Sequence, residues 1–186
     1  MKKILTLTLL SIVMTFSNAI GQTQNKTITD SSISWTGSKV TGKHSGIINL
    51  KEGFLQMNGE ELVGGSITID MTSIIVTDLE GDSKASLEGH LKSDDFFGVA
   101  NHPTANLEII SAERNGNNYA VTGIITIKGV AQPINFTLGV KNQYATATLT
   151  INRTLFGIRY GSGSFFDNLG DKAISDDFEI RAKLVL

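Results

Sequence analysis

The stretch from His90 to Pro103, HLKSDDFFGVANHP, contains the densest group of reactive side chains in this chain. Asp94 and Asp95 stand beside Phe96 and Phe97, with a histidine near each end of the run. Two interpretations suit these residue types: a metal or acid–base site, or an apolar cap held in place by polar side chains. The rest of the sequence has to distinguish between them.

A metal site would draw on the three histidines, His44, His90 and His102, together with the two aspartates. No two of these histidines have the i, i+4 spacing of a helical ligand pair or the i, i+2 spacing of a strand pair. Neighbouring aspartates point apart unless a turn folds them together, and no nucleophile lies nearby. We therefore predict neither a metal site nor catalytic residues, and we expect one aspartate to cap backbone N–H groups of the loop.

The run YGSGSFF matches neither of two common enzyme motifs. The sequence has no G-x-S-x-G nucleophile elbow, and Phe166 stands where a dinucleotide-binding fingerprint needs its third glycine. We interpret this run as a surface loop, and we predict that the protein is not an enzyme.

The first residues have the pattern of a secretory signal peptide. Two lysines precede an apolar run, and small residues follow it at spacings that suit a signal peptidase. The chain has no cysteine, which excludes disulfides and a lipid-modified cysteine at the cleavage point. We predict a cleaved signal peptide over 1–21, an N-terminal segment over 22–32, one domain over 33–186, and a periplasmic or secreted location.

The charge balance argues against nucleic acid as a partner. The chain has 16 basic and 18 acidic residues, and removing the two lysines of the signal peptide leaves 14 against 18, a net charge of −4. No cluster of lysine and arginine is present to neutralise a phosphate backbone, so we predict no nucleic-acid binding.

Alternating hydrophobicity predicts a protein built almost entirely of β-strands. Between Tyr119 and Gly129, for example, Val121, Ile125 and Ile127 share one face. Turn-forming residues such as the Asn58-Gly59 pair separate the strands, and short connections favour antiparallel pairing. The eight predicted strands cover 33–40, 43–58, 61–77, 104–113, 119–129, 134–140, 145–152 and 176–186.

One segment departs from this alternation and predicts a short helix. From Asp82 to Ser93, Leu87 and Leu91 are spaced four apart, and we expect Asp82 or Ser83 to be the N-cap. A glycine inside the helix costs about 1 kcal/mol relative to alanine, so packing must hold this helix in place.

Alternation alone does not separate a closed barrel from a two-sheet sandwich. An eight-stranded barrel has an interior that side chains fill or that holds one small ligand. Small residues on the inner faces leave space there, which suggests a cavity; they are Gly123, Ala145, Ala147 and Ala182.

Three motifs in this order and spacing resemble those of the YceI-like family of exported bacterial proteins. They are HLKSDDFF…HP over 90–103, GIITIKGVAQPI over 123–134 and RTLFGI over 153–158, within a resemblance that runs from about Ile33 to the end. The resemblance implies an all-β fold: an extended eight-stranded antiparallel lipocalin-like β-barrel with a short α-helical insertion. It also implies an elongated apolar cavity for a long hydrophobic molecule, typically a polyisoprenoid chain such as a quinone tail or a lipid-linked carrier, and no catalytic residues.

The chain departs from the family pattern in two places. Many members have a histidine in an F-x-V-x-H pattern on an early strand, where this chain has WTGSKVTGKHSG with Lys39 near that place. The identity of a ligand head group therefore does not carry over. The segment from Phe165 to Asp176 is also extra, and the resemblance gives it no role.

Inward apolar side chains suit a cavity wall and a packed core equally well, so Phe96 and Phe97 fit either. We predict carriage, storage or sensing of a long apolar ligand (isoprenoid, quinone or fatty chain) in the lumen. The alternative is a packed barrel without a lipid ligand that binds a protein or glycan at its surface. Such a lipid is the only bound group expected, and transient membrane contact and a homodimer are compatible with either function. The predicted ligand-binding residues are Trp35, Phe54, Ile67, Ile69, Leu91, Phe96, Phe97, Ile125, Phe136, Leu138 and Phe156.

Overall fold

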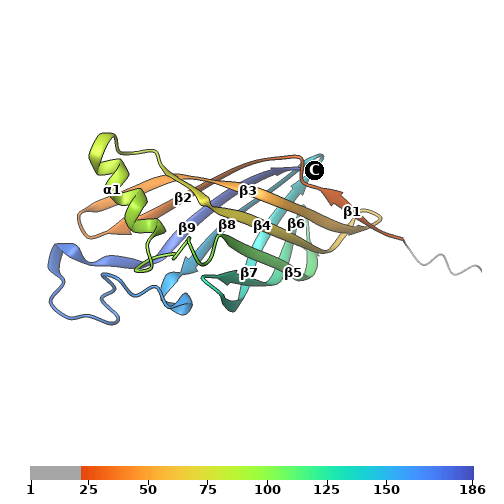
Figure 1. Ribbon diagram of the computed structural model, residues 1–186. Helices are drawn as coiled ribbons and strands as arrows, with labels where there is room; N and C mark the ends of the chain where they lie inside the picture. The colour runs from red at the N-terminus through yellow and green to blue at the C-terminus, as the bar shows by residue number, and fades with distance from the viewer. Residues whose placement is uncertain (1–21) are drawn as a thin grey trace, which may run out of the picture.

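Segments in which apolar and polar residues alternate form strands, and tight turns connect most of them. The computed structural model describes residues 22–186, which contain nine strands and one α-helix (Figure 1). The strands are β1 Thr23–Thr27, β2 Asp30–Lys39, β3 Gly42–Asn58, β4 Glu61–Val76, β5 Thr104–Asn115, β6 Asn118–Ile127, β7 Val130–Lys141, β8 Tyr144–Asn152 and β9 Ile174–Val185.

The sheet closes on itself to form a barrel. Neighbouring strands pair antiparallel in the order β3-β2-β9-β8-β7-β6-β5-β4, and pairing of β3 with β4 joins the two ends. Strands β2 to β9 therefore form the closed eight-stranded antiparallel barrel that the sequence predicts. The expected fold class, with its short helical insertion, is confirmed.

The N-terminal part of the described chain belongs to this sheet. Strand β1 pairs with the second half of β3, with Thr27 opposite Phe54, and β2 begins at Asp30. Residues 22–32, which we expected to precede the domain, thus contribute to its wall. The predicted signal peptide over 1–21 lies outside the described residues.

One seam of the barrel is only half paired. The contact between β7 and β8 runs through Leu138–Lys141 and Tyr144–Ala147, so the two strands diverge toward the end where β7 begins. There Gln132 Nε2 donates to the carbonyl of Leu155, 3.2 Å away, and ties β7 to the segment that follows β8. Pro133 lies in this diverging half, where its missing N–H breaks no ladder bond.

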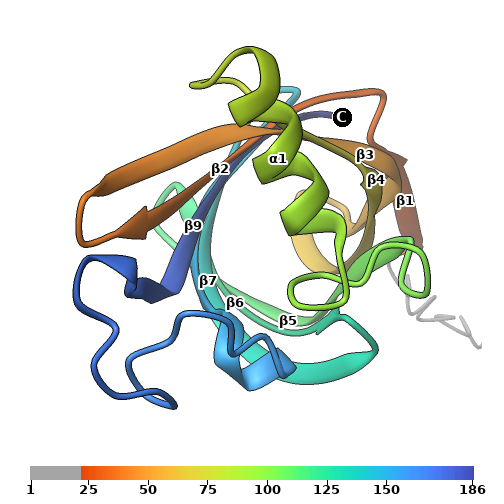
Figure 2. The ribbon, with the colours of Figure 1, turned by 60° about the vertical axis from the view of Figure 1, so that its left-hand side comes forward.

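The helix α1, Gly81–Lys92, lies across one end of the barrel (Figure 2). It starts one residue earlier than predicted, and its N-cap is Glu80, whose side chain makes no capping bond. The predicted caps Asp82 and Ser83 are therefore wrong, because both lie inside the first turn. Among residues 22–186, no helix has the length and apolar character needed to cross a membrane.

The opposite end of the barrel is filled by side chains. Leu55, Leu62, Val121 and Ala145 are fully buried there or nearly so. The hydroxyl of Tyr119 donates to the carbonyl of Glu60 over 3.1 Å, which satisfies the polar end of a buried ring. This end is a packed core, so a cavity has to lie nearer to α1.

Candidate ligand-binding site

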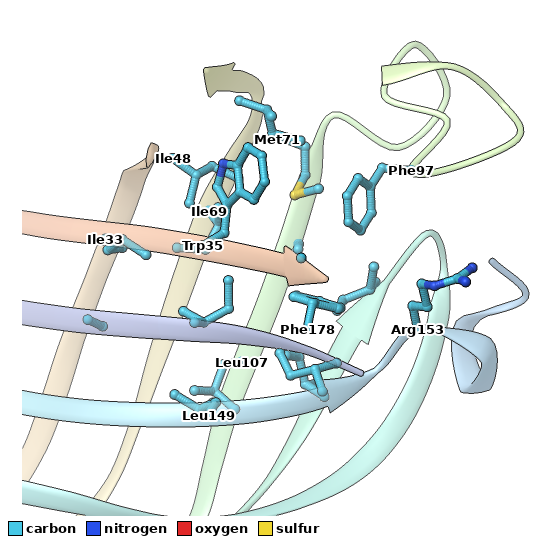
Figure 3. Close-up of a pocket in the computed structure, with 18 of the residues that line it drawn as sticks. Ile33, Trp35, Ile48, Ile69, Met71, Phe97, Leu107, Leu149, Arg153 and Phe178 are labelled. Carbon is cyan, nitrogen blue, oxygen red and sulfur yellow. The ribbon is translucent and has the colours of Figure 1, made fainter. Parts of the chain in front are cut away.

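The inward side chains of β2 to β9 leave a cavity of about 190 Å³ inside the barrel (Figure 3). Its wall is apolar apart from three residues, Arg153, Ser175 and Asp177, which all lie at the α1 end. Ligand pockets commonly measure about 300–1,000 Å³. This narrower space suits one slender chain better than a bulky ring system.

Small residues create part of this space. Ala147 on β8 and Ala182 on β9 are direct neighbours in the sheet, and both border the cavity, as does Gly37 on β2. Ala145, in contrast, lies in the packed end and is fully buried. A Cβ on Gly123 would come within 2.5 Å of the carbonyl oxygen of Glu108, so that glycine serves close strand packing and does not border the cavity.

The structure brings most of the predicted ligand-binding residues together around one space. They come from four strands, from α1 and from the loop after it. Whether a ligand touches them stays a prediction. The nine that line the cavity are Trp35, Ile67, Ile69, Leu91, Phe96, Phe97, Ile125, Phe136 and Leu138.

The two others lie elsewhere. The register of β3 against β4 shifts between Leu50 and Glu52, and beyond that irregularity Leu55 is buried inside while Phe54 takes the alternate, outer face. Phe156 is buried in the short 3₁₀-helix η1, Arg153–Phe156, past the end of β8. Strict alternation predicts the wrong face for a residue that follows a register shift or lies in a helical turn.

Twenty lining residues are not among the predicted ligand-binding residues, although most of them lie on the inner face of predicted strands. Phe178, Ile180 and Leu184 on β9 alternate with outward charged residues, a pattern readable from the sequence alone. Met71 and Ile74 lie in the part of β4 between Asp70 and Ile75, where the register against β3 shifts and alternation breaks. The missed residues are Ile33, Gly37, Ile48, Met71, Ile74, Ala105, Leu107, Ile109, Ile127, Ala147, Leu149, Ile151, Arg153, Ile174, Ser175, Asp177, Phe178, Ile180, Ala182 and Leu184.

An aromatic cluster stands at the α1 end of the cavity. The ring of His90 lies edge-on to Phe96 and Tyr160, with centroids 5.0 Å and 4.4 Å away. Phe97 meets Phe178 in the same way at 6.2 Å, so the cluster reaches from α1 to β9 (Figure 3). Both phenylalanines of the HLKSDDFF motif therefore border the lumen, and His90 acts as a packing group between rings.

The loop that presents these rings is held by its own backbone. The N–H groups of Phe97 and Gly98 donate to the carbonyls of Leu91 and Ser93, at 3.1 Å and 2.8 Å. Lys128 Nζ donates to the main-chain carbonyl of Asp94. The expected capping of the loop by an aspartate side chain is not among these bonds, because backbone carbonyls already accept from these N–H groups.

Arg153 is the polar anchor of this end. It is buried, and its Nε, Nη1 and Nη2 donate to the carbonyls of Ser175, Ile158 and Ile174 at 2.9, 3.0 and 3.1 Å. Burial lowers the pKa of Arg153, while the charge of Asp176, whose Oδ1 lies 3.6 Å away, opposes that shift. Figure 3 shows Arg153 at the edge of the site. Its guanidinium lies over the ring of Phe96, 5.6 Å from the centroid, so the charge fixes the chain after β8 and borders the cavity only at its α1 end.

Hydroxyl groups lower the pKa of Asp176, the acidic partner of Arg153. Hydrogen bonds from Ser162 and Ser164 hold the pKa of Asp176 below its ordinary value, and the charge of Arg153 adds to this effect.

Within residues 22–186, no three histidine, aspartate or glutamate side chains lie close enough together to hold a metal ion.

Comparison with known proteins identifies the barrel. A profile of the YceI-like domain matches residues 25–186. The chain belongs to the YceI-like family. It is 34% identical over 68 residues to a UPF0312 protein of Pseudomonas aeruginosa, over 37% of this chain and 32% of that protein. Protein YceI of Escherichia coli is 32% identical over 69 residues, over 37% and 33% of the two chains. Each match thus spans about a third of the curated relative.

Solved structures share the fold. BcnA of Burkholderia cenocepacia superposes with a TM-score of 0.67 at 22% identity, over 84% of this chain and 96% of its own. A polyisoprenoid-binding domain from Saccharophagus degradans, implicated in plant cell wall breakdown, gives a TM-score of 0.57 at 13% identity, over 87% and 95% of the two chains.

Proposed function

We propose that this protein binds a long, slender apolar chain of the polyisoprenoid kind in the lumen of its barrel. The observation that carries this proposal is the apolar cavity, closed by packed side chains at one end and bordered by polar residues only at the other. A structural neighbour described as a polyisoprenoid-binding domain supports the same class of ligand.

Binding of an apolar chain in the lumen needs no specific polar contact. Burial of one methylene group contributes about 0.8 kcal/mol, so ten carbons contribute about 8 kcal/mol before the cost of association is subtracted. A charged head group would be costly inside a wall without polar partners. The apolar tail therefore belongs in the lumen, and any polar head at the α1 end.

The alternative of a solidly packed barrel that binds partners only at its surface is less well supported, because the inner wall encloses free space. We place the protein in the periplasm or outside the cell, as a carrier, store or sensor of its ligand, on the sequence pattern of residues 1–21. Mass spectrometry of its N-terminus after expression in a Gram-negative host tests the predicted cleavage.

Two measurements test the ligand. Organic extraction of the purified protein followed by mass spectrometry should release a prenyl or similar lipid, and the extracted protein should take up a fluorescent prenyl probe. In Ala147→Phe the new ring occupies the lumen, so we expect at least about a tenfold loss of probe affinity, comparable to the loss of a few buried methylenes.

Thr148→Phe is the matched control, because the neighbouring position on β8 faces outward and is exposed. It should leave the probe affinity unchanged. Uptake by Ala147→Phe at the wild-type level, with its circular dichroism intact, would show that the lumen is not the binding site.

A further inference from the structure

The ladder between β7 and β8 stops halfway along both strands. It joins four residue pairs, from Leu138–Ala147 to Lys141–Tyr144, whereas β6 and β7 share ten pairs and β8 and β9 share nine. In the described part of the chain, residues 130–137 of β7 and 148–152 of β8 therefore have a strand partner on one side only. The two strands form a fork that widens toward the α1 end of the barrel.

This fork stands over the hollow half of the barrel. Phe136 of β7 lies on one side of it, Leu149 and Ile151 of β8 lie on the other, and all three line the cavity. The paired part of the seam, in contrast, runs toward the packed end, where Ala145 is fully buried. A gap between the diverging strands would therefore lead directly into the cavity.

The 3₁₀-helix η1 closes the fork in place of a strand. It contacts both β7 and β9, and its Phe156 is buried in the apolar core (Figure 2). On the β9 side, Arg153 holds η1 through the carbonyls of Ser175 and Ile174.

The β7 side of η1 is held much less firmly. Within residues 22–186, one side-chain hydrogen bond joins β7 to η1: Gln132 Nε2 donates to the carbonyl of Leu155 over 3.2 Å. Leu155 itself is 56% exposed. Movement of η1 away from β7 therefore breaks this one bond and no bond of a ladder.

The other route into the cavity, under α1, is obstructed by aromatic rings. His90 packs between Phe96 and Tyr160, and Phe97 packs against Phe178 of β9 across the mouth. Backbone hydrogen bonds fix the loop that presents the two phenylalanines. Entry there would have to separate several packed rings and break bonds of the loop, so the fork is the route that opens more readily.

We propose that the apolar ligand enters and leaves sideways through the fork, with η1 as the gate and the bond between Gln132 and Leu155 as its latch. This inference rests on the proposed function, because it concerns the route to the same cavity. A slit along the wall suits a long chain, which can then enter along its length. The chain turns sharply on both sides of η1, at Asn152, which caps the N–H of Thr154, and at Gly157, whose φ is +76°. Such element ends are where gating segments commonly pivot.

Stopped-flow fluorescence with a prenyl probe tests the gate. In Gln132→Ala the latch is lost, so the rate constants of uptake and of release should both rise about fivefold, the factor that one hydrogen bond contributes. The Kd should stay unchanged, because the latch is closed in the free and in the occupied protein. Thr122→Ala is the matched control, since it removes a 2.9 Å bond to Asn135 across the fully paired seam of β6 and β7. Its rates should equal those of the wild type.

Glu88→Ala distinguishes the two routes, because it frees α1 from Val76 and leaves the fork intact. Its rates should also equal those of the wild type. Faster uptake in Glu88→Ala would show that the ligand enters under α1 and would overturn the proposal. Wild-type rates in Gln132→Ala would overturn it as well.

Covalent closure of the fork is the converse test. The chain has no cysteine, so the two residues of Gln132→Cys/Leu155→Cys can be joined selectively by a short bismaleimide. The fast uptake of the wild type should then be lost, and it should persist when each cysteine is capped separately with N-ethylmaleimide. Equal rates in the joined and the capped protein refute the gate alone. A wild-type protein that binds no probe at equilibrium refutes the proposed function itself.

Discussion

Gly46 on β3 shapes the cavity wall because its neighbour leaves no room for a side chain. An ideal Cβ there would lie 2.6 Å from the indole of Trp35 and 1.9 Å from the carbonyl oxygen of Ile75. Trp35, the only tryptophan of the chain, therefore lies against the backbone of the facing strand. The indole can take this position because Gly46 has no side chain.

Replacing Gly46 with alanine should displace the indole and destabilise the barrel. Overpacking of a filled site costs about 1–3 kcal/mol, and a backbone oxygen cannot move aside as a side chain would. Urea unfolding followed by the fluorescence of Trp35 reports both effects. Gly37→Ala is the control: Gly37 borders the cavity, but its Cβ would meet nothing within 4 Å. Equal stability of the two variants would contradict the close approach.

Asp176 gives the molecule an acid-sensitive contact. Its pKa is lowered in the folded state, so its ionised form stabilises the fold above the unfolded-state pKa of about 3.9. That contribution is lost as the pH falls through the lower, folded-state pKa. Acid should therefore loosen the segment after β8 by removing the negative charge beside Arg153.

We expect Asp176→Asn to lower the free energy of unfolding at pH 7 by about 2 kcal/mol, because a charged partner of Arg153 is lost. Between about pH 5 and pH 2 the wild type should lose more stability than the variant, since only the wild type protonates this group. Urea unfolding across that pH range checks both statements. Parallel pH curves for the two proteins would show that Asp176 does not titrate with folding.

At the scale of elements, α1 is a weakly held cover. Leu91 is its one buried side chain within residues 81–92, and two glycines reduce its intrinsic helix propensity. The carboxylate of Glu88 accepts a hydrogen bond from the N–H of Val76, 2.9 Å away, which fastens the helix to the end of β4. The barrel wall, with its continuous ladders, should be far more resistant to opening.

Glu88→Ala should release the helix, because the N–H of the buried Val76 loses its acceptor. A loss of about 1–3 kcal/mol corresponds to at least about fivefold faster amide exchange in α1. Hydrogen-exchange mass spectrometry of the 81–92 peptide measures this exchange rate. Lys84→Ala is the control, since its ion pair with Glu88 is 3.9 Å long and exposed and contributes little. An unchanged exchange rate in Glu88→Ala would mean that Leu91 alone holds the helix.

At the scale of the whole molecule, the barrel combines a packed end with a hollow one. A ligand that fills the hollow end binds only the folded state, so it shifts the unfolding equilibrium by mass action. At a concentration of about one hundred times the Kd, this stabilisation is about 2.7 kcal/mol. The stability of the purified protein should therefore depend on its lipid content.

Removal of lipid by organic extraction should lower the Tm, and a prenyl alcohol should restore it. Differential scanning calorimetry measures the change, and Ala147→Phe, whose lumen is already filled, should show no response to the alcohol. A Tm that rises equally in both proteins would place the alcohol on the outer surface.

The strands of this fold were predictable because alternation persists over long stretches with one buried face. All eight predicted strands match β2 to β9, with differences of a few residues at their ends. The N-cap of α1 was not predictable, since Asp82 and Ser83 suit a first turn as well as an N-cap. Strand β1 was not predicted, because its side chains are exposed throughout and show no alternation of apolar and polar residues.

The sequence by itself determined the strands, the inner faces of most of them and the aromatic character of the HLKSDDFF loop. Local alternation encodes which side of a strand is buried. The closed barrel was indicated by the resemblance to the YceI-like family, because alternation suits a two-sheet sandwich equally well. Only the tertiary structure decided that Phe54 faces outward, that Phe97 meets Phe178, and that free space remains at one end. Those facts depend on register shifts and on contacts between residues distant in the chain, which hydrophobicity patterns do not record.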